Sequence, residues 1–311
     1  MKKIYLLLAV FCLLFSGCSS LAMNMVANAL TGEGSSDVFT SDNDPELVGA
    51  ALPFAIKLYE SLLAANPNHE GLITTVGSLY VMYANAFVYG PAELKQRDDY
   101  AAFSEAKLRA RNLYLRGANI LYEGLNKKYP GLKEAFKKGK FPGIAAKMKK
   151  KDVPALYWCA AGFLAAYSMN PLDMELGFRV PELLAMINRA YELDPDFNKG
   201  SLDDFYILFH ANVPAEMGGD KSRVEMHFQR ALEKSGGRLA SPYVSYADSV
   251  SRPAQNYEDF KKKLETALAI DVDADKSSRL VNIISQRKAR YFLDTAHLRF
   301  LFIGNDEWDE E

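Results

Sequence analysis

The stretch EMGGDKSRVEMHFQRALEKSGGRLASPYV, residues 216–244, decides which fold the sequence predicts. A Gly-Gly-Asp turn comes near its start, and Ser222 is the expected N-cap of a helix. Val224, Phe228 and Ala231 follow four and three residues apart, so they share one face of that helix. A second Gly-Gly pair soon ends it. A helix this short, with a small residue on its apolar face, needs a neighbouring helix on each side.

The same spacing recurs four more times along the chain. Each copy has an apolar residue, a second apolar or aromatic residue four positions on and a small or apolar residue three positions later. Three of the copies also have a proline five positions further on. The copies begin at Ala55, Ala118, Leu183 and Phe260. This is the second-helix half of the tetratricopeptide pattern.

Two segments carry the first-helix half of the same pattern, at residues 73–80 and 158–165. The corresponding positions further on are degenerate, because Asp204 and Ser245 stand where an apolar residue belongs. We therefore predict an all-α protein built as a cryptic tetratricopeptide-type array of helix pairs, an α-solenoid. The alternative is an ordinary bundle of unrelated amphipathic helices.

Glycine and proline positions predict where individual elements begin and end. Residues 31–45 are rich in Gly, Ser and Asp and are expected to form a flexible spacer or extended loop. The Gly-Pro pair at 90–91 is expected to end the helix that begins at Leu72. Residues 170–179 are expected to form a loop, with the next helix beginning at Pro181.

The N-terminus has the composition of a bacterial secretion signal. Two lysines precede an apolar run at residues 4–15, which is too short to span a bilayer as a helix. The following Ser-Gly-Cys18 resembles a lipobox, in which the Cys18 thiol is acylated, for example with palmitate, and the chain is cut before it. The predicted organisation is a signal peptide at 1–17, a lipidated N-terminus and spacer at 18–46, and a helical tetratricopeptide-like domain at 47–311. The alternative is an ordinary secretory signal with an incidental cysteine.

The overall composition describes a globular body on this tether. The chain has 311 residues, of which 49% are hydrophobic and 24% charged, enough to bury a large core. A formal net charge of −2 argues against nucleic acid as the main partner. Cys159 is the only cysteine outside the leader and the lipobox, and its apolar surroundings predict a buried, inert thiol.

Motifs for catalysis and metal binding are not found in the sequence. The four histidines lack zinc spacing, and there is no CxxC or GxSxG. The segment 219–222 has the Lys-Ser of a P-loop but an Asp where Gly is required. The acidic segment 271–275 has Lys276 in the EF-hand glycine position, so an acidic turn at a helix start is the better interpretation. We therefore predict no enzyme activity, no cofactor and no metal.

Large aromatic side chains on helices rich in small residues are candidates for contacts with an apolar ligand. The predicted lining residues are Tyr83, Trp158, Tyr167, Phe205 and Phe209. The alternative is that these rings belong to the plain core, and the same alternative applies to His210.

A lysine-rich insert at residues 131–151 departs from the repeat pattern. A solvated connector is the simplest interpretation of its charges. The alternative is contact with anionic lipid head groups or an acidic partner.

Six stretches together resemble one family. They are DPELVGAALPFAIKLYESLL (44–63), KDVPALYWCAAGFLAAYS (151–168), RAYELDPDFNKGSLDDFY (189–206), HFQRALEKSGGRLASPYVSYADSV (227–250), ALAIDVDA (267–274) and RLVNIISQRKARYFLD (279–294). The chain resembles the TatT family, the tetratricopeptide T component associated with tripartite ATP-independent periplasmic (TRAP) transporters. The match is poorest in the basic insert. The resemblance implies a periplasm-facing lipoprotein that works with the solute-binding P component, and a cleft or pore for a small hydrophobic solute. It implies no catalytic residue.

Two functions follow from these observations. The first is a membrane-anchored module that binds the P component and binds or relays a small hydrophobic solute, with a homo-oligomer left open. The alternative is a tetratricopeptide lipoprotein scaffold for envelope or cell-wall assembly. Fold and tether are common to both, so the sequence alone does not separate them.

Overall fold

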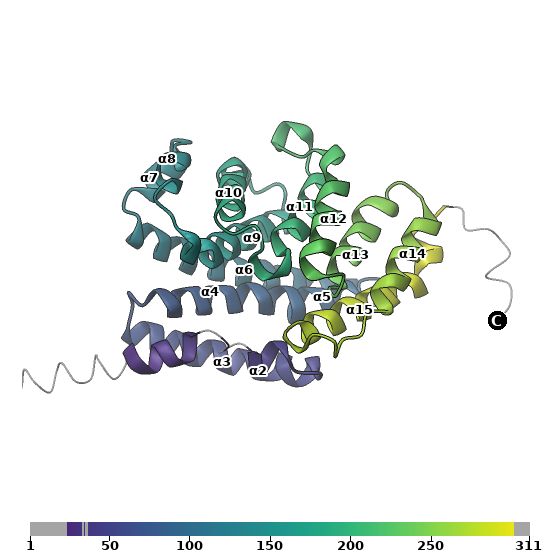
Figure 1. Cartoon of the computed structure of the whole chain (residues 1–311), viewed down its shortest axis with the longest axis horizontal. Coiled ribbons are helices and arrows are strands. Elements are labelled where there is room, and N and C mark those ends of the chain that lie inside the picture. Colours follow the sequence, from purple (N-terminus) through teal and green to yellow (C-terminus); the bar gives the residue numbers. More distant parts are fainter. Residues whose placement is uncertain (1–23, 33, 35–36, 302–311) are drawn as a thin grey trace, which may run out of the picture.

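The structure is a computed structural model that describes residues 24–32, 34 and 37–301. Within these residues the chain is helical and has no β-strand, which confirms the all-α prediction (Figure 1). Residues 24–31 form the first helical segment that the structure describes. The predicted signal peptide and Cys18 lie outside the described residues, so the lipoprotein signal stays a prediction.

Nine α-helices of more than three turns, within the described residues, make up the body. They are α3 (Pro45–Ala65), α4 (Glu70–Tyr83), α6 (Tyr100–Lys128), α9 (Val153–Met169), α10 (Met174–Leu193), α11 (Ser201–Asn212), α12 (Val224–Ser235), α14 (Tyr257–Leu268) and α15 (Arg279–Asp294). Shorter α-helices are α2 (Asp37–Thr40), α5 (Gly90–Glu93), α7 (Leu132–Lys137), α8 (Phe141–Ala145) and α13 (Ser241–Tyr246). Two π-helical turns are η1 (Ala84–Tyr89) and η6 (Ala247–Ser251). The 3₁₀ turns are η2 (Lys150–Asp152), η3 (Phe197–Lys199), η4 (Ala215–Met217), η5 (Lys221–Arg223), η7 (Lys276–Ser278) and η8 (Ala296–Leu298).

Helices that follow one another in the chain pack side by side. Contacts join α3 to α4, α4 to α6, α6 to α9, α9 to α10, α11 to α12, α13 to α14 and α14 to α15. Alternate helices also touch, α4 with α9, α11 with α13 and α13 with α15. This is the order of contacts expected of stacked helix pairs. The assignment of these pairs to the tetratricopeptide class stays a prediction.

Glycines bring α4, α6 and α9 into close contact. A Cβ at Gly117 of α6 would lie 2.5 Å from the carbonyl oxygen of Gly77 in α4. A Cβ at Gly162 of α9 would lie 2.9 Å from Cγ2 of Val81 and 3.0 Å from Cβ of Ala118. Real side chains do not approach this closely, so at these crossings the absence of a side chain sets the distance between helices.

The main core extends from the end of α4 through α6, α9 and α10 to the start of α11. Its largest fully buried side chains include Phe141, Phe163 and Met186. Smaller clusters lie between α3 and α4, between α11 and α12, and among α13, α14 and α15. Because Phe136 and Phe141 are buried, the basic insert is anchored to the core by its aromatic residues.

The last long helix returns to the N-terminal layer. In Figure 1, α15 lies beside α2 and α3, with which it is in contact. Arg287 pairs with Glu46 of α3, Lys288 Nζ lies 2.9 Å from Glu93 Oε2 of α5, and Arg279 donates to the Ser41 carbonyl at 3.0 Å. We call these polar contacts the seam. They join the two ends of the helical array.

Three predicted boundaries are wrong. Asp173 caps α10, which begins at Met174, so Pro181 lies inside the helix. The ring of Pro181 is exposed, and the helix tolerates one missing backbone hydrogen bond there. Gly90 has helical dihedral angles, so the helical path from α4 continues through η1 into α5. Residues 31–45 include the short helix α2 as well as turns.

The predicted N-cap of the decisive helix is also wrong. The Asp220 carboxylate accepts from the backbone N–H of Ser222 at 3.0 Å, so it caps the 3₁₀ turn η5. This turn leads directly into α12, which begins at Val224. The apolar face itself is as predicted, because Val224, Phe228 and Ala231 are all buried.

Candidate functional site

Helix α9 presents two large aromatic rings that the core does not fully cover. Its buried face, which includes Cys159 and Phe163, packs against α4, α6 and α10. Tyr157 and Trp158 are half-buried, and their ring centroids lie 4.9 Å apart at 73°. The Tyr157 ring also lies 5.4 Å from that of Phe197, in the turn before α11. Three rings therefore gather where α9 meets η3.

Helix α11 adds a second aromatic pair. The ring of half-buried Phe205 stacks on the buried Phe209 ring at 5.8 Å and meets the Tyr206 ring edge-on at 5.6 Å. Leu208, the next residue on the outer side of this helix, is 43% exposed. Phe205 and the Tyr157 group pack against the same core cluster. Each of the two groups leaves apolar side-chain atoms partly exposed, and we call them together the aromatic surface on α9, η3 and α11.

Asp204 places a carboxyl group next to this aromatic surface. Burial raises its pKa above the ordinary value, and the hydroxyls of Ser245 and Ser241 on α13 only partly offset this effect. Its Oδ1 is buried without a hydrogen-bond partner among the described residues. Burial and the nearby Asp204 charge together raise the pKa of Tyr157. Because Oδ1 of Asp204 is buried, a ligand with a hydrogen-bond donor would reach it only after the side chains that cover it move.

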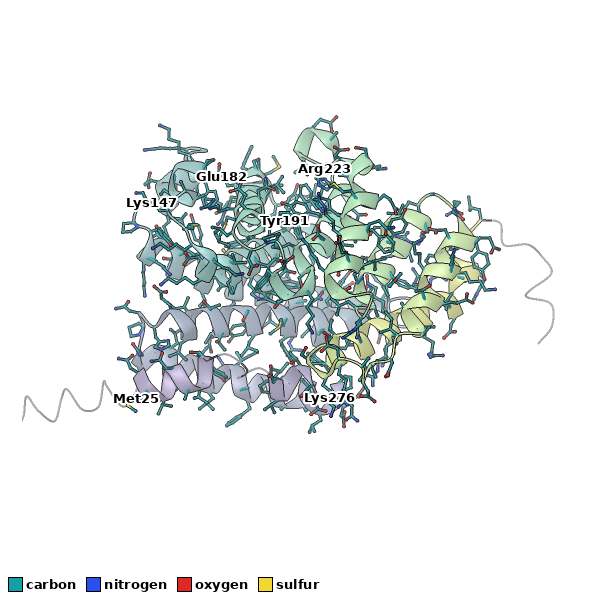
Figure 2. All side chains as sticks on the ribbon, in the orientation of Figure 1. Met25, Lys147, Glu182, Tyr191, Arg223 and Lys276 are labelled. Atoms are coloured by element: carbon teal, nitrogen blue, oxygen red, sulfur yellow. The ribbon has the colours of Figure 1, made fainter. Side chains whose placement is uncertain are left out.

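The neighbouring residue Asp203 has a structural role, because its buried carboxylate bonds to side chains of adjacent helices. Its carboxylate is fully buried and accepts from Lys234 Nζ at 2.6 Å and the Tyr191 hydroxyl at 3.1 Å. His227 Nδ1 lies 2.7 Å from the same carboxylate. Burial alone would raise the pKa of Asp203, but the hydrogen bonds from His227 and Lys234 lower it. This cluster fixes α11 against α10 and α12, and so holds Asp204 and Phe205 in place (Figure 2, where Tyr191 is labelled).

Two buried histidines lie behind the same helix. The His227 and His210 rings stack on Tyr206 with centroid distances of 4.6 and 5.4 Å. Burial lowers the pKa of His210 to about 4, so the imidazole is neutral at physiological pH. His210 is therefore a core histidine, as the alternative interpretation held. No group of three or more potential metal ligands occurs in the part of the chain that the structure describes.

The profile of the family described as "TRAP transporter T-component" matches residues 41–300. The chain belongs to this family. A protein from Treponema pallidum (strain Nichols), described as uncharacterized, is 34% identical over 309 residues, covering 94% of this chain and 95% of the relative. The matched range includes every helix from α3 to α15, and with them the aromatic surface and Asp204. The T component is a transport-associated protein, and its family is not a family of enzymes.

The structure places the five residues predicted for this T component in three different regions. Phe205 and Phe209 stack on each other, but Phe209 is only 5% exposed and belongs to the core. Trp158 is half-buried beside Tyr157. Tyr83 stacks on Phe87 at the far end of α4, and Tyr167 lies against Gly177 of α10. Trp158 and Phe205 remain the two that fit the site, and ligand contact by any of the five stays a prediction.

Asp204 was not predicted as a candidate site residue, although the sequence marks it as a break in the apolar repeat pattern. Asp204 and Ser245 were recognised as positions where the repeat pattern loses its apolar residue. In the structure the Ser245 hydroxyl is near enough to Asp204 to lower its pKa, so the two exceptions to the pattern lie in the same neighbourhood. Tyr157 and Phe197 carried no such signal, because aromatic residues are common throughout the chain.

The T component also has two open surface grooves, and neither contains a predicted ligand residue. One, of about 380 Å³, lies along α6 and is lined by Leu108, Arg109, Leu113 and Arg116 among others. The other, of about 360 Å³, lies along α15 and includes Ile283, Arg287 and Tyr291. Each is lined by charged as well as apolar side chains from a single helix, so neither suits an enclosed apolar solute.

The predicted thiol behaviour agrees with the structure. Cys159 is fully buried, and its Sγ donates weakly to the Ala118 carbonyl at 3.6 Å. Burial raises its pKa to about 12, which suppresses the reactive thiolate.

Proposed function

We propose that this T component is a lipid-anchored, periplasm-facing helical-repeat protein that binds the solute-binding P component of a TRAP transporter. In this proposal it also binds or relays a small hydrophobic solute. The family membership supports a role in TRAP transport. The contacts between successive helices support the repeat assignment. Helical-repeat arrays form extended surfaces that bind other proteins, which is why this assignment supports a partner.

The observation that carries the solute proposal is the half-buried aromatic surface around Asp204. Rings from α9, η3 and α11 supply apolar contact, and Asp204 Oδ1 lacks a hydrogen-bond partner among the described residues. A solute with an apolar body and one hydroxyl or amide donor would satisfy that oxygen once the side chains that cover it move aside. The raised pKa of Asp204 favours the neutral carboxyl, which costs less to bury beneath such a solute than a charge.

Mass spectrometry of small molecules extracted from the purified protein tests the solute proposal. We expect a co-purifying apolar molecule that is lost on Phe205→Ala. Phe178→Ala is the matched control, because Phe178 is an aromatic residue on α10 that is 78% exposed and outside the surface described above. Equal amounts of the molecule in both variants, or its absence from the unaltered protein, would contradict the proposal. Circular dichroism would verify that Phe205→Ala stays folded.

Co-purification with the cognate solute-binding protein tests the partner proposal. We expect a complex at micromolar concentrations that withstands gel filtration. If no complex forms, and envelope-assembly proteins are captured instead, the alternative of a scaffold lipoprotein is favoured.

The mass of the mature N-terminal peptide tests the anchor. We expect cleavage before Cys18 and added acyl chains on that residue, since more than one chain is needed for stable membrane attachment. An unmodified Cys18 in protein purified from bacterial membranes would contradict the anchor and leave the partner proposal intact.

A further inference from the structure

The exposed face of α3 is apolar along the helix except for Ser61. Its members recur three or four residues apart and share one side of the helix. They are Leu47, Ala50, Ala51, Phe54, Leu58, Ser61 and Ala65, which we call the α3 stripe. Leu47, Phe54 and Leu58 are 58%, 74% and 46% exposed. The stripe spans about 27 Å, because an α-helix rises about 1.5 Å per residue.

The opposite face of α3 accounts for the packing of the helix. Val48, Leu52 and Ile56 are buried against α4, and within the residues that the structure describes the stripe stays exposed. By length and composition, α3 and the helix Glu70–Glu93 are both apolar enough to cross a membrane. Half of the apolar window of the second is buried in the protein, compared with 17% for α3. The apolar character of α3 therefore exceeds what its own core contact requires.

Charges beside the stripe do not oppose a lipid surface. The two acidic residues of α3 are both neutralised, Glu46 by Arg287 and Glu60 by Lys57 and Arg116. Lys57 lies at the edge of the stripe, and its side chain is 63% exposed. A long apolar strip flanked by a lysine is the pattern of helices that lie in a membrane interface.

The position of the N-terminal segment indicates that a membrane covers the α3 stripe. Residues 24–31 pack beside the C-terminal end of α3, where Asn66 Nδ2 donates to Asn24 Oδ1 at 2.5 Å and the Tyr59 hydroxyl donates to the Leu30 carbonyl at 3.0 Å. Met25 is 65% exposed, and Figure 2 shows it at the outer edge of the molecule formed by the α3 layer. Five residues lie between Cys18 and Asn24, so the two Cα atoms are at most about 20 Å apart. Acyl chains on Cys18 would hold the bilayer close to this end of α3.

We propose that the α3 stripe rests at the boundary between the head groups and the acyl chains of the bilayer that holds the Cys18 lipid. This inference rests on the proposed anchor. It fixes the orientation of the T component, with α3 toward the lipid and α10, α11 and α12 directed away from it. In Figure 1 these helices lie on the side of the molecule opposite α3. The partner protein would then approach a surface that the membrane leaves free.

The test uses the full-length acylated protein in vesicles of phosphatidylethanolamine and phosphatidylglycerol. A single cysteine is introduced by Phe54→Cys or, as the matched control, Phe178→Cys, and labelled with a polarity-sensitive fluorophore. The two phenylalanines are similarly exposed, at 74% and 78%, on different sides of the body. Cys159 does not compete for the label because it is fully buried. Brominated acyl chains in the vesicles quench fluorophores that enter the bilayer.

We expect the label at residue 54 to lose most of its fluorescence in brominated vesicles, and the label at 178 to be unchanged. Equal behaviour of the two labels in protein that carries the acyl mass and floats with the vesicles would overturn the inference and leave the anchor standing. Shielding of residue 54 that depends on protein concentration and not on bromination would assign the stripe to a second copy, which also overturns it. Protein without the acyl mass that does not float would overturn the anchor and the inference together.

Discussion

In the α4–α6–α9 block, backbones approach until only glycine fits between them, whereas at the seam α15 meets the N-terminal layer through charged side chains. The block is sensitive to volume, because each atom added at a crossing must displace a neighbour. The seam is sensitive to solvent and salt, because its ion pairs are partly exposed. The α4–α6–α9 block is therefore tightly packed, whereas the seam is held by weaker polar contacts. Variants in the two regions are expected to differ in size of effect and in salt dependence.

The largest effect is expected from Gly117→Ala in the block. The new methyl group would lie 2.5 Å from a backbone oxygen and 2.9 Å from Cβ of Tyr80, and neither can move freely. We expect a loss of about 3 kcal/mol or more in the free energy of unfolding, measured by urea denaturation. Gly143→Ala is the control, because nothing lies within 4 Å of its Cβ position. Similar losses in the two variants would show that the close approach is not limiting.

Lys234→Met is expected to have the next largest effect. Asp203 is fully buried, and removal of Lys234 takes away one of its hydrogen-bond donors and its nearest ammonium group. We expect the free energy of unfolding to fall by about 2–3 kcal/mol. This is less than for an ion pair in which both partners are buried, because Lys234 is partly exposed to solvent. Lys57→Met, at a surface pair, should change the urea midpoint little. If the two lysine variants are equally stable, the buried cluster does not hold α11 and α12 together.

A smaller, pH-dependent effect is expected from His210. Its folded pKa, about 4, lies below its ordinary value of 6.5, so the unfolded chain binds more protons between these values. Stability should therefore fall as the pH decreases through this window. Asp203 acts in the same direction only at lower pH, because its lowered pKa lies beneath the ordinary carboxyl value. Urea midpoints measured against pH should flatten across the window in His210→Phe, and an unchanged slope would contradict the assignment.

The smallest effect is expected at the seam from Arg287→Ala. This substitution removes the pair with Glu46, whose side chain is 71% exposed. We expect a slight decrease in the urea midpoint at low ionic strength that disappears at high salt, where the unaltered protein has already lost the benefit of the pair. A decrease that persists at high salt would mean that Arg287 contributes packing rather than charge.

Helical spacing predicted most of the fold because the apolar positions of the repeat are core positions. Val224, Phe228, Ala231, Phe260 and Leu264 are all buried, whereas the apolar positions of the copy that begins at Ala55 are only partly buried. Spacing does not encode where a helix starts when its first turn is polar. This is why α10 was predicted to begin at Pro181, although the Asp173 cap and Leu176 already belong to its start.

The candidate site could be predicted only in part. Trp158 and Phe205 were predicted because large rings on small-residue helices are unusual, and their contact with a ligand stays a prediction. Phe209 was assigned to a ligand but lies in the core, since the outward and inward faces of α11 are both aromatic. Asp204 was visible only as a defect in the repeat. Its pairing with Ser245 depends on the contact between α11 and α13, which no local pattern specifies.

The return of α15 to α2 and α3 has an evolutionary consequence. An open stack of helix pairs can lengthen or shorten by duplication and deletion without disturbing its ends. Here one added pair would carry Arg287 and Lys288 away from Glu46 and Glu93. The seam therefore constrains the number of helices between the paired residues. Homologues that keep these four charged residues should have the same number of helices between the acidic and the basic members of each pair.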